Sequence, residues 1–186
     1  MDALDLASFD RFRPLKRSEY DKLVDLGAFE DEHIELIHGI LVPMSPAKPP
    51  HAYCVDELEE RLKQCLGERA KVRVEKPFLA FGESEPEPDI AVVPREDYRT
   101  RHPETAWLIV EVSDDSLRKD RRIKGPLYAA SGVPEYWIVN IKAKRVEIHT
   151  ELRDGKYTVE RRVGPDGTVS PLAFPDVQLR VSDFLP

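Results

Sequence analysis

The chain has 186 residues, of which 41% are hydrophobic and 34% are charged, and its formal net charge at pH 7 is −7. This size suits one domain, and the composition excludes a disordered chain and a membrane protein, since no apolar run approaches the roughly 20 residues that span a bilayer. The first residues, MDALDLASFDRF, are acidic where a secretory signal is basic, so we expect a cytoplasmic protein. We expect a single domain over residues 1–186, with residues 1–14 poorly ordered or loosely docked.

The acidic net charge argues against a simple nucleic-acid-binding protein, whose surface is usually basic. It does not exclude a nuclease, because carboxylates that hold a metal count as negative charges until the metal binds. Charge is also unevenly distributed along the chain. Acidic residues crowd residues 83–89, whereas Arg118–Lys124 (RKDRRIK) is strongly basic.

The first third of the chain predicts a helix, a hairpin and a second helix. Ser18-Glu19-Tyr20-Asp21 has the pattern of a helix start, and IELIHGILV predicts two short strands that turn at His38-Gly39. The segment PMSPAKPP (43–50) predicts a proline-rich loop. Apolar residues at spacings of three and four then predict an amphipathic helix from His51 to Leu66.

Two cysteines lie on this second helix, and they cannot pair with each other. Cys54 and Cys65 are eleven residues apart, which is about 16 Å along a helix, and a disulfide needs Cα atoms within about 7 Å. Both fall on the apolar stripe, so we expect buried thiols. The chain has no Cys-x-x-Cys pair or Cys/His cluster for zinc.

The rest of the chain predicts a buried sheet. Val72–Leu79 alternates as a strand, and three nearly all-apolar runs (90–93, 107–112 and 136–139) predict strands that are covered on both faces. We expect a helix over Leu117–Ala130 with a kink at Gly125-Pro126. The tail predicts antiparallel strands at 146–149 and 157–159, with turns at 154–155 and 166–167. Tyr128, Tyr136 and Trp137 are expected in the core. This order predicts an α/β fold with a mixed sheet rather than a Rossmann fold.

Two acidic residues lie in or beside apolar runs, where burying an ionised carboxylate is energetically unfavourable. Glu111 ends the apolar run WLIVEV, on the strand face of Trp107 and Ile109, and Asp89 opens the run IAVV. Together with the backbone carbonyl of Val112, they offer the hard oxygen ligands that Mg²⁺ prefers. The alternative is that each acid is paired with an arginine.

Lys124 follows Glu111 by thirteen residues, on the helix after the strand. A helix packed on the sheet could bring its ammonium to the metal, where it would orient or deprotonate a water and offset charge on the phosphate. Asp120 is four residues earlier and could pair with Lys124 and hold it in place. The alternative is that both are solvated charges of the basic segment.

The stretches EPDIAVV, WLIVEVSDDS and DRRIKGPLYAASGVPEYWIVN resemble a family of putative restriction endonucleases, abundant in cyanobacteria, within the PD-(D/E)XK superfamily. The resemblance extends to IELIHGILVPMSP and to His51 with its helix, and covers about residues 15–186. It implies a restriction-endonuclease-like mixed sheet flanked by helices, with extra antiparallel β-strands at both ends.

The resemblance also implies roles for individual residues. Asp89 and Glu111 are implied as metal ligands for Mg²⁺ or Mn²⁺, and Lys124 as the catalytic lysine. Glu35 matches an acidic position at the start of the family's hairpin, as an auxiliary ligand or support. The superfamily's lysine usually stands two residues after the glutamate, where this chain has Ser113, so Lys124 is implied as a relocated substitute.

His51 and Glu35 have simpler alternatives. His51 opens a helix, where it could contact phosphate or metal or could cap the helix, and Glu35 could neutralise a local cation. Tyr128, Tyr136 and Trp137 lack the spacing of a base-stacking platform. The chain also lacks the serine-hydrolase elbow, the P-loop and the dinucleotide-binding glycine motif.

Three hypotheses follow from these observations. The first is a metal-dependent endonuclease that hydrolyses DNA phosphodiester bonds, expected as a homodimer so that two sites cut both strands. The second is an inactive nuclease-fold module for nucleic-acid or protein interaction, which the net acidity and the relocated lysine favour. The third is a small β-rich binding domain without phosphate chemistry, which predicts that Asp89 and Glu111 lie far apart.

Overall fold

The structure of the protein is a computed structural model, and it describes residues 13–186. The expectation for residues 1–14 therefore falls almost entirely outside the described residues. Within them, the Arg13 guanidinium lies 2.9 Å from the Glu19 carboxylate. No helix in this part of the chain combines the length and the hydropathy needed to cross a bilayer.

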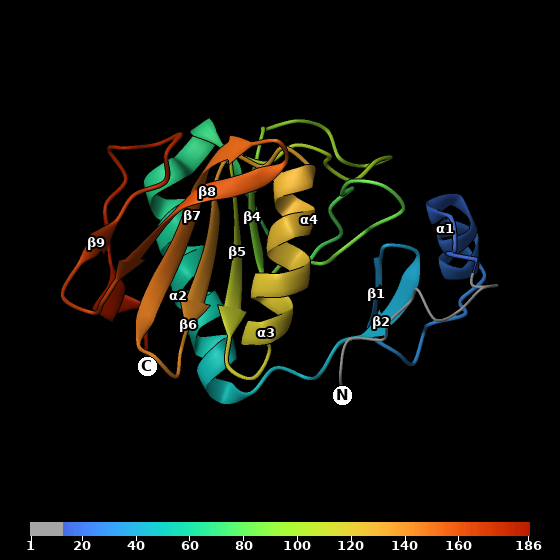
Figure 1. Ribbon diagram of the computed structural model, residues 1–186, viewed down its shortest axis with the longest axis horizontal. Helices are drawn as coiled ribbons and strands as arrows, with labels where there is room; N and C mark the ends of the chain where they lie inside the picture. Colours follow the sequence, from blue (N-terminus) through green and yellow to red (C-terminus); the bar gives the residue numbers. More distant parts are fainter. Residues whose placement is uncertain (1–12) are drawn as a thin grey trace.

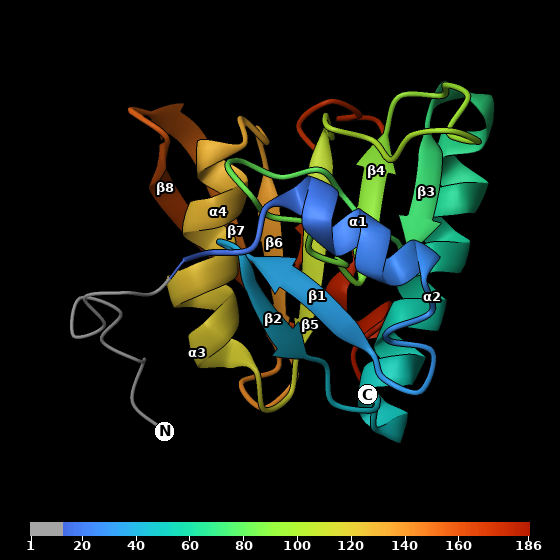
Figure 2. The ribbon, with the colours of Figure 1, turned by 90° about the vertical axis from the view of Figure 1, so that its right-hand side faces the viewer.

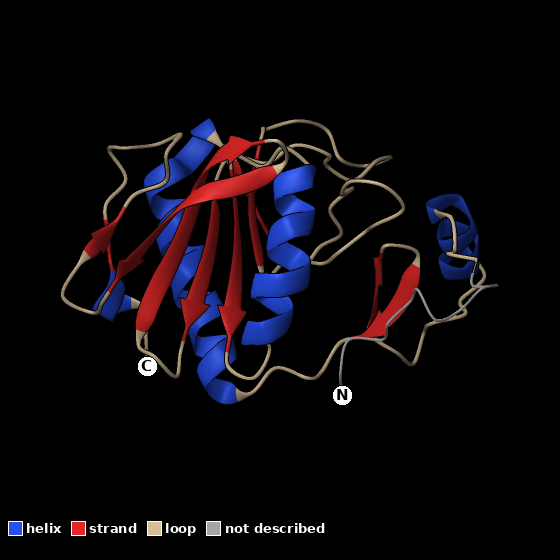
Figure 3. Ribbon diagram, viewed as in Figure 1, coloured by secondary structure: helices blue, strands red, loops and turns tan. Residues whose placement is uncertain are grey.

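Helical segments separate groups of consecutive strands along the chain (Figures 1 and 3). The helical segments are α1 (Arg17–Asp25), α2 (Pro49–Leu66), the 3₁₀ turn η2 (Gly67–Arg69), α3 (Leu117–Lys119), the π-helical turn η3 (Asp120–Lys124), α4 (Gly125–Ala130) and the 3₁₀ turn η4 (Val181–Asp183). The strands are β1 (Ile34–Ile37), β2 (Ile40–Pro43), β3 (Lys71–Val74), β4 (Ile90–Val93), β5 (Leu108–Ser113), β6 (Tyr136–Asn140), β7 (Arg145–Arg153), β8 (Lys156–Val163), β9 (Thr168–Val169) and β10 (Leu179–Arg180).

A six-stranded mixed sheet in the order β3-β4-β5-β6-β7-β8 forms the centre of the molecule. Its pairs are antiparallel except β5–β6, which is parallel. A parallel pair needs a crossover, and the helical segment from Leu117 to Ala130 provides it. Two small antiparallel pairs, β1–β2 and β9–β10, stand apart from this sheet. The predicted mixed sheet with antiparallel additions at both ends is confirmed.

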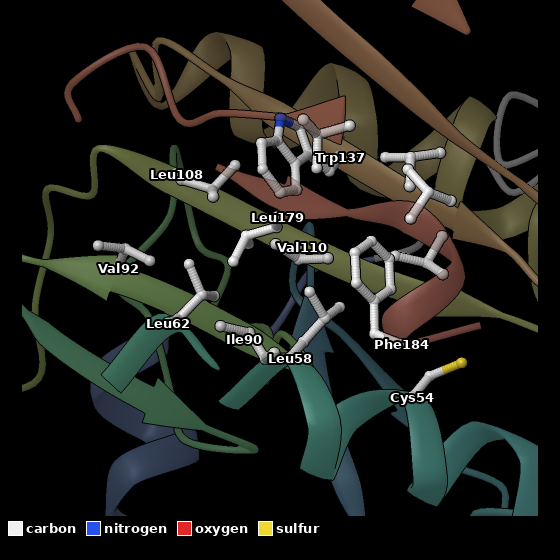
Figure 4. Packing of buried hydrophobic residues seen from close by; sticks show 14 of the residues in the cluster. Cys54, Leu58, Leu62, Ile90, Val92, Leu108, Val110, Trp137, Leu179 and Phe184 are labelled. Carbon is white, nitrogen blue, oxygen red and sulfur yellow. The ribbon is translucent and has the colours of Figure 1, made fainter. Parts of the chain in front are cut away.

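One face of the central sheet packs against α2 and the C-terminal segment. Leu58 and Leu62 of α2 face Ile90 and Val110 of the sheet, and Phe184 closes the same cluster (Figure 4). All five side chains are fully buried. At about 2 kcal/mol for each buried side chain of this size, this face supplies a large part of the hydrophobic stabilisation.

The opposite face carries Ala91, Ile109, Glu111 and Ile138, and we call it the site face. It packs against the crossover helix, whose Leu127 and Tyr128 are buried there. The β1–β2 hairpin and α1 lie over the same face, in front of β4 and β5 in Figure 2. Polar side chains on this face are thereby enclosed between the sheet and these elements.

The sequence predicted that Trp107 lies on the same strand face as Glu111, and this prediction is wrong. Strand β5 begins only at Leu108, and Trp107 packs with the core on the α2 side, where its ring meets the Phe174 ring edge-on at 5.2 Å. Ile109 does share the face of Glu111. The regular pairing of β5 with β4 begins at Leu108, so the alternation of faces along β5 does not extend back to Trp107.

The loop within the proline-rich segment 43–50 is shorter than the sequence predicted. Pro43 ends β2, and Pro49 and Pro50 form the first turn of α2. Prolines are tolerated there because the first helical N–H groups have no partner within the helix. The predicted hairpin turn is confirmed, and both His38 and Gly39 adopt positive φ.

Three further predictions need correction. Helix α1 begins at Arg17 with Lys16 as its cap, so Ser18 is not the cap, although Glu19 does bond back to the Lys16 N–H. Cys54 is buried as predicted, but Cys65, in the last turn of α2, is exposed. The strand predicted over Val72–Leu79 ends at Val74, because Glu75 has a positive φ.

The crossover helix contains a π turn before Pro126, where the sequence predicted a kink. The Gly125 N–H donates to the Asp120 carbonyl, five residues back, in place of the usual four. A proline ring collides with the carbonyl four residues before it, and the wider turn relieves that collision. The Asp120 carbonyl also accepts a hydrogen bond from the Tyr136 hydroxyl at 3.2 Å.

Candidate active site

Asp89 and Glu111 lie beside each other on the site face. Ile90 pairs with Val110 in the antiparallel register of β4 and β5, so Asp89, one residue before, stands opposite Glu111. Opposite residues in such a pair have Cα atoms about 5 Å apart. The two acids are only 8% and 4% exposed. The hypothesis of a domain in which they lie far apart is wrong.

Asp89 is held at the end of its strand by two donors. Its Oδ2 accepts the Val112 N–H at 2.5 Å and lies 3.2 Å from His51 Nε2. The hydrogen bond with Asp89 raises the pKa of His51 against the lowering effect of burial. His51 therefore contacts the site through Asp89, and the first turn of α2 places it there. The contact that the structure gives Val112 is through its amide, so its carbonyl as a ligand stays a prediction.

Glu111 is bound to the crossover helix. Its Oε1 accepts hydrogen bonds from the Lys124 ammonium at 3.0 Å and from the Tyr128 hydroxyl at 2.7 Å. These two donors are four residues apart and lie on the same side of the helix. The structure thus brings Asp89, Glu111 and Lys124 together as the sequence predicted.

Glu35 enters the same cluster from strand β1. It is fully buried, and its Oε2 lies 3.0 Å from the Lys124 ammonium. Its Oε1 accepts from the Lys119 ammonium at 3.1 Å. Lys119 and Lys124 are five residues apart. Side chains at this spacing point in different directions on an α-helix but in similar directions across a π turn. The π turn thus lets both lysines reach Glu35.

The cluster has more acids than cations in a buried setting. Burial alone would lower the pKa of Lys124, but Glu111 and Glu35 outweigh it and raise that pKa. Burial raises the pKa of Glu111, and Lys124 offsets this rise only in part. Lys124 is therefore a fixed cation, and Glu111 lacks enough positive charge around it to make its ionised form fully favourable.

Asp120 does not pair with Lys124, contrary to the prediction. Its carboxylate accepts hydrogen bonds from the Ser113 hydroxyl at 2.6 Å and the Ser116 hydroxyl at 2.5 Å. Burial raises the pKa of Asp120 against these two hydroxyls. Asp120 and Ser113 thus fasten the crossover helix to the end of β5, which is a supporting role.

A carboxylate of the cluster can bind a metal through an oxygen that accepts no hydrogen bond from the described residues. Within residues 13–186, no three His, Cys, Asp or Glu side chains are gathered closely enough to form a metal site by themselves. Asp89 Oδ1 and Glu111 Oε2 nevertheless accept no hydrogen bond from the described residues, whereas both oxygens of Glu35 are occupied by lysines. Asp89 and Glu111 fit a metal that takes further ligands from backbone or water, and Glu35 fits a supporting role.

Two residues of the cluster were missed by sequence reasoning. Tyr128 was assigned to the core, which is correct for its ring, but its hydroxyl binds Glu111. Its position four residues after Lys124 could have indicated this. Lys119 could not have been found, because its contact with Glu35 depends on the π turn.

Comparisons with known proteins show the family and the fold of the chain. The model of the family described as "Uma2: Putative restriction endonuclease" matches residues 17–182. A crystal structure described as a putative nuclease from Anabaena variabilis superposes with a TM-score of 0.74 at 17% identity, covering 92% of this chain and 97% of that chain. At this identity the likeness shows a shared fold. None of the curated proteins matches the sequence.

Proposed function

Because the chain belongs to the Uma2 family of putative restriction endonucleases, we propose that it is an endonuclease that hydrolyses DNA phosphodiester bonds with the help of Mg²⁺ or Mn²⁺. One observation carries the proposal. The β4–β5 register sets Asp89 beside Glu111, and the buried Lys124 ammonium lies 3.0 Å from Glu111. This is a compact set of two acids and one cation on a partly enclosed face.

Asp89 and Glu111 would hold the metal through the oxygens that accept no hydrogen bond from the described residues. Carboxylate oxygens are the ligands that Mg²⁺ and Mn²⁺ prefer, and the Val112 carbonyl is the proposed third ligand. The chemistry that such an ion supplies is polarisation of a phosphate and a lower pKa of a bound water. It would also offset the excess of carboxylates in the cluster.

Lys124 would act through its charge. Its raised pKa keeps the ammonium protonated, so it suits orienting a water or stabilising negative charge on the phosphate, and it does not suit accepting a proton. Tyr128 and Glu35 hold Lys124 and Glu111 in place, and His51 does the same for Asp89. These contacts fix the reacting groups before a substrate arrives.

Cleavage of supercoiled plasmid tests the proposal. The purified protein should nick and linearise plasmid with Mg²⁺ or Mn²⁺, and EDTA should stop it. Asp89→Ala and Glu111→Ala should each lower the rate at least a hundredfold, since each removes a metal ligand. Asp166→Asn, at an exposed turn, is the control and should cut at the normal rate. No cleavage by the wild type, or normal cleavage by both site variants, would contradict the proposal.

The second candidate is an inactive nuclease-fold module that binds nucleic acid or protein. Two observations favour it: the net charge of −7 and the pairing of Lys124 with two acids. It predicts weak metal binding. Calorimetric titration with Mn²⁺ separates the two candidates, because a tight site that Asp89→Ala abolishes would count against an inactive module.

The endonuclease proposal includes a homodimer, because cutting both strands calls for two active sites. Sedimentation analysis at micromolar concentration measures the assembly. A dimer is the expected result, and a monomer that still linearises plasmid would contradict this part of the proposal.

A further inference from the structure

The basic segment Arg118–Lys124 holds more cations than the site and the fold use. Lys119 and Lys124 pair with Glu35, and Arg121 donates two hydrogen bonds to the buried Glu147 at 2.8 and 2.6 Å. The two remaining cations of the segment have no such partner.

Arg118 and Arg122 are these two cations. Both are exposed, and neither forms an ion pair with any residue between 13 and 186. Two uncompensated guanidiniums on one short segment stand out in a protein with a net charge of −7. Since no contact within the described chain uses them, their side chains are available to a partner.

Their place on the helix sets them close to the active site. They are four residues apart, so they share one side of the helical segment. The neighbouring side chains define the inner side, because Asp120 bonds to Ser113 of β5 and Lys124 bonds to Glu111. Arg118 and Arg122 therefore stand on the outer side of the same turns that carry the catalytic lysine.

We propose that Arg118 and Arg122 bind backbone phosphates of the nucleic acid on one side of the bond positioned at Asp89 and Glu111. This inference rests on the proposed function and names its substrate-binding surface. A guanidinium presents a planar fork of N–H donors that matches phosphate oxygens, and it stays charged at any working pH. Such contacts carry no base specificity and set the register of the duplex on the enzyme.

The test measures binding apart from cleavage. The affinity for a short labelled duplex DNA is followed by fluorescence anisotropy in EDTA, over salt concentrations of about 50 to 200 mM. The variants are Arg118→Gln/Arg122→Gln and the charge-keeping Arg118→Lys/Arg122→Lys. The control, Arg161→Gln/Arg180→Gln, removes two exposed arginines without ion pairs from the α2 side of the sheet. Plasmid cleavage by the wild type is measured in parallel.

The Gln pair should weaken binding on the order of tenfold and reduce the slope of log affinity against log salt by about 1.8, or about 0.9 for each phosphate that the variant no longer neutralises. The Lys pair and the control should keep a slope near that of the wild type. Equal weakening by the Gln pair and the control would reveal a general charge effect and overturn the inference. Unchanged binding by the Gln pair would overturn it too, and with normal plasmid cutting the proposed function would stand. Absence of DNA binding by the wild type would overturn both.

Discussion

At the scale of single residues, the buried ammonium of Lys124 is the group on which the cluster depends. It lies 3.0 Å from both Glu35 and Glu111 and is only 2% exposed. Removing one partner from a buried ionic group leaves the others without compensation, which costs far more than an exposed pair contributes. The stability of the site and the chemistry proposed for it therefore depend on the same charge.

We expect Lys124→Met to lower the free energy of unfolding by about 3 kcal/mol, because Glu111 loses its cation and Glu35 keeps only Lys119. Adding Glu35→Gln to this variant should restore part of the loss, since one acid is then neutral. Urea unfolding measures both. Lys22→Met, at an exposed lysine of α1, should change stability by less than about 0.5 kcal/mol. A loss below about 1 kcal/mol in Lys124→Met would mean that the ammonium does not stabilise the cluster.

Glu85 offers a test of how burial couples stability to pH. Burial raises its pKa to about 7, helped by Asp21 and opposed by Arg17, and the residue is 6% exposed. The folded state then holds this proton more tightly than the unfolded state, in which a glutamate has a pKa of about 4.3. The contribution of Glu85 to stability is thus full below about pH 4 and is lost as the pH rises to 7.

We expect Glu85→Gln to stabilise the protein by up to about 3 kcal/mol at pH 8, since about 1.4 kcal/mol corresponds to each unit of pKa shift. At pH 4 the variant and the wild type should have nearly equal free energies of unfolding. Thermal or urea unfolding at the two pH values provides the comparison. An equal effect at both values would show that the proton is not the cause.

At the scale of elements, the π turn of the crossover helix shapes the candidate active site. It lies directly before Pro126 and lets both Lys119 and Lys124, from one helical segment, form ion pairs with Glu35. A methyl group on Gly125 would lie 3.2 Å from the Asp120 carbonyl oxygen and 3.3 Å from the ring of Tyr136. Both neighbours are held by the hydrogen bond between them, so neither can move away freely.

We expect Gly125→Ala to destabilise the protein by about 1–2 kcal/mol, although alanine is the better helix former, because overpacking outweighs propensity here. The control is Gly164→Ala, where an added methyl group would meet nothing within 4 Å. It should be neutral or slightly stabilising. Urea unfolding of the pair decides the matter, and a stabilising Gly125→Ala would show that the turn can relax.

At the scale of the whole molecule, the C-terminal segment completes the core on the side away from the site. Val169, Leu179 and Phe184 are buried in one cluster with residues of the central sheet and α2. Figure 4 shows Leu179 and Phe184 in this cluster. They cover the part of this sheet face that α2 leaves open. The rigidity of the sheet that positions Asp89 and Glu111 thus depends on residues far from both in the sequence.

Phe184→Ala should lower the free energy of unfolding by about 3–5 kcal/mol, the usual cost of removing a fully buried phenyl ring. Leu172→Ala, in the same segment but 58% exposed, should cost less than about 0.5 kcal/mol. Calorimetric melting of both variants is sufficient. Equal and small losses would show that the C-terminal segment is not part of the cooperative core.

The sequence by itself determined the buried strands and the identity of the candidate site. IAVV and LIVEV are covered on both faces because they have no polar side, and Glu111 is conspicuous because an acid there needs compensation. The resemblance across three stretches of sequence supplied Lys124. Local patterning decides such features, since they depend on residues a few positions apart.

Only the tertiary structure decided which charges meet. Glu35 and Lys119 are 84 residues apart, and their contact depends on the hairpin lying over the site face and on the extra residue of the π turn. Asp120 bonds to Ser113 and Ser116 and not to Lys124, because the helix end is fastened to β5. Pairings between distant segments follow from packing and backbone geometry, which spacing along one segment does not specify.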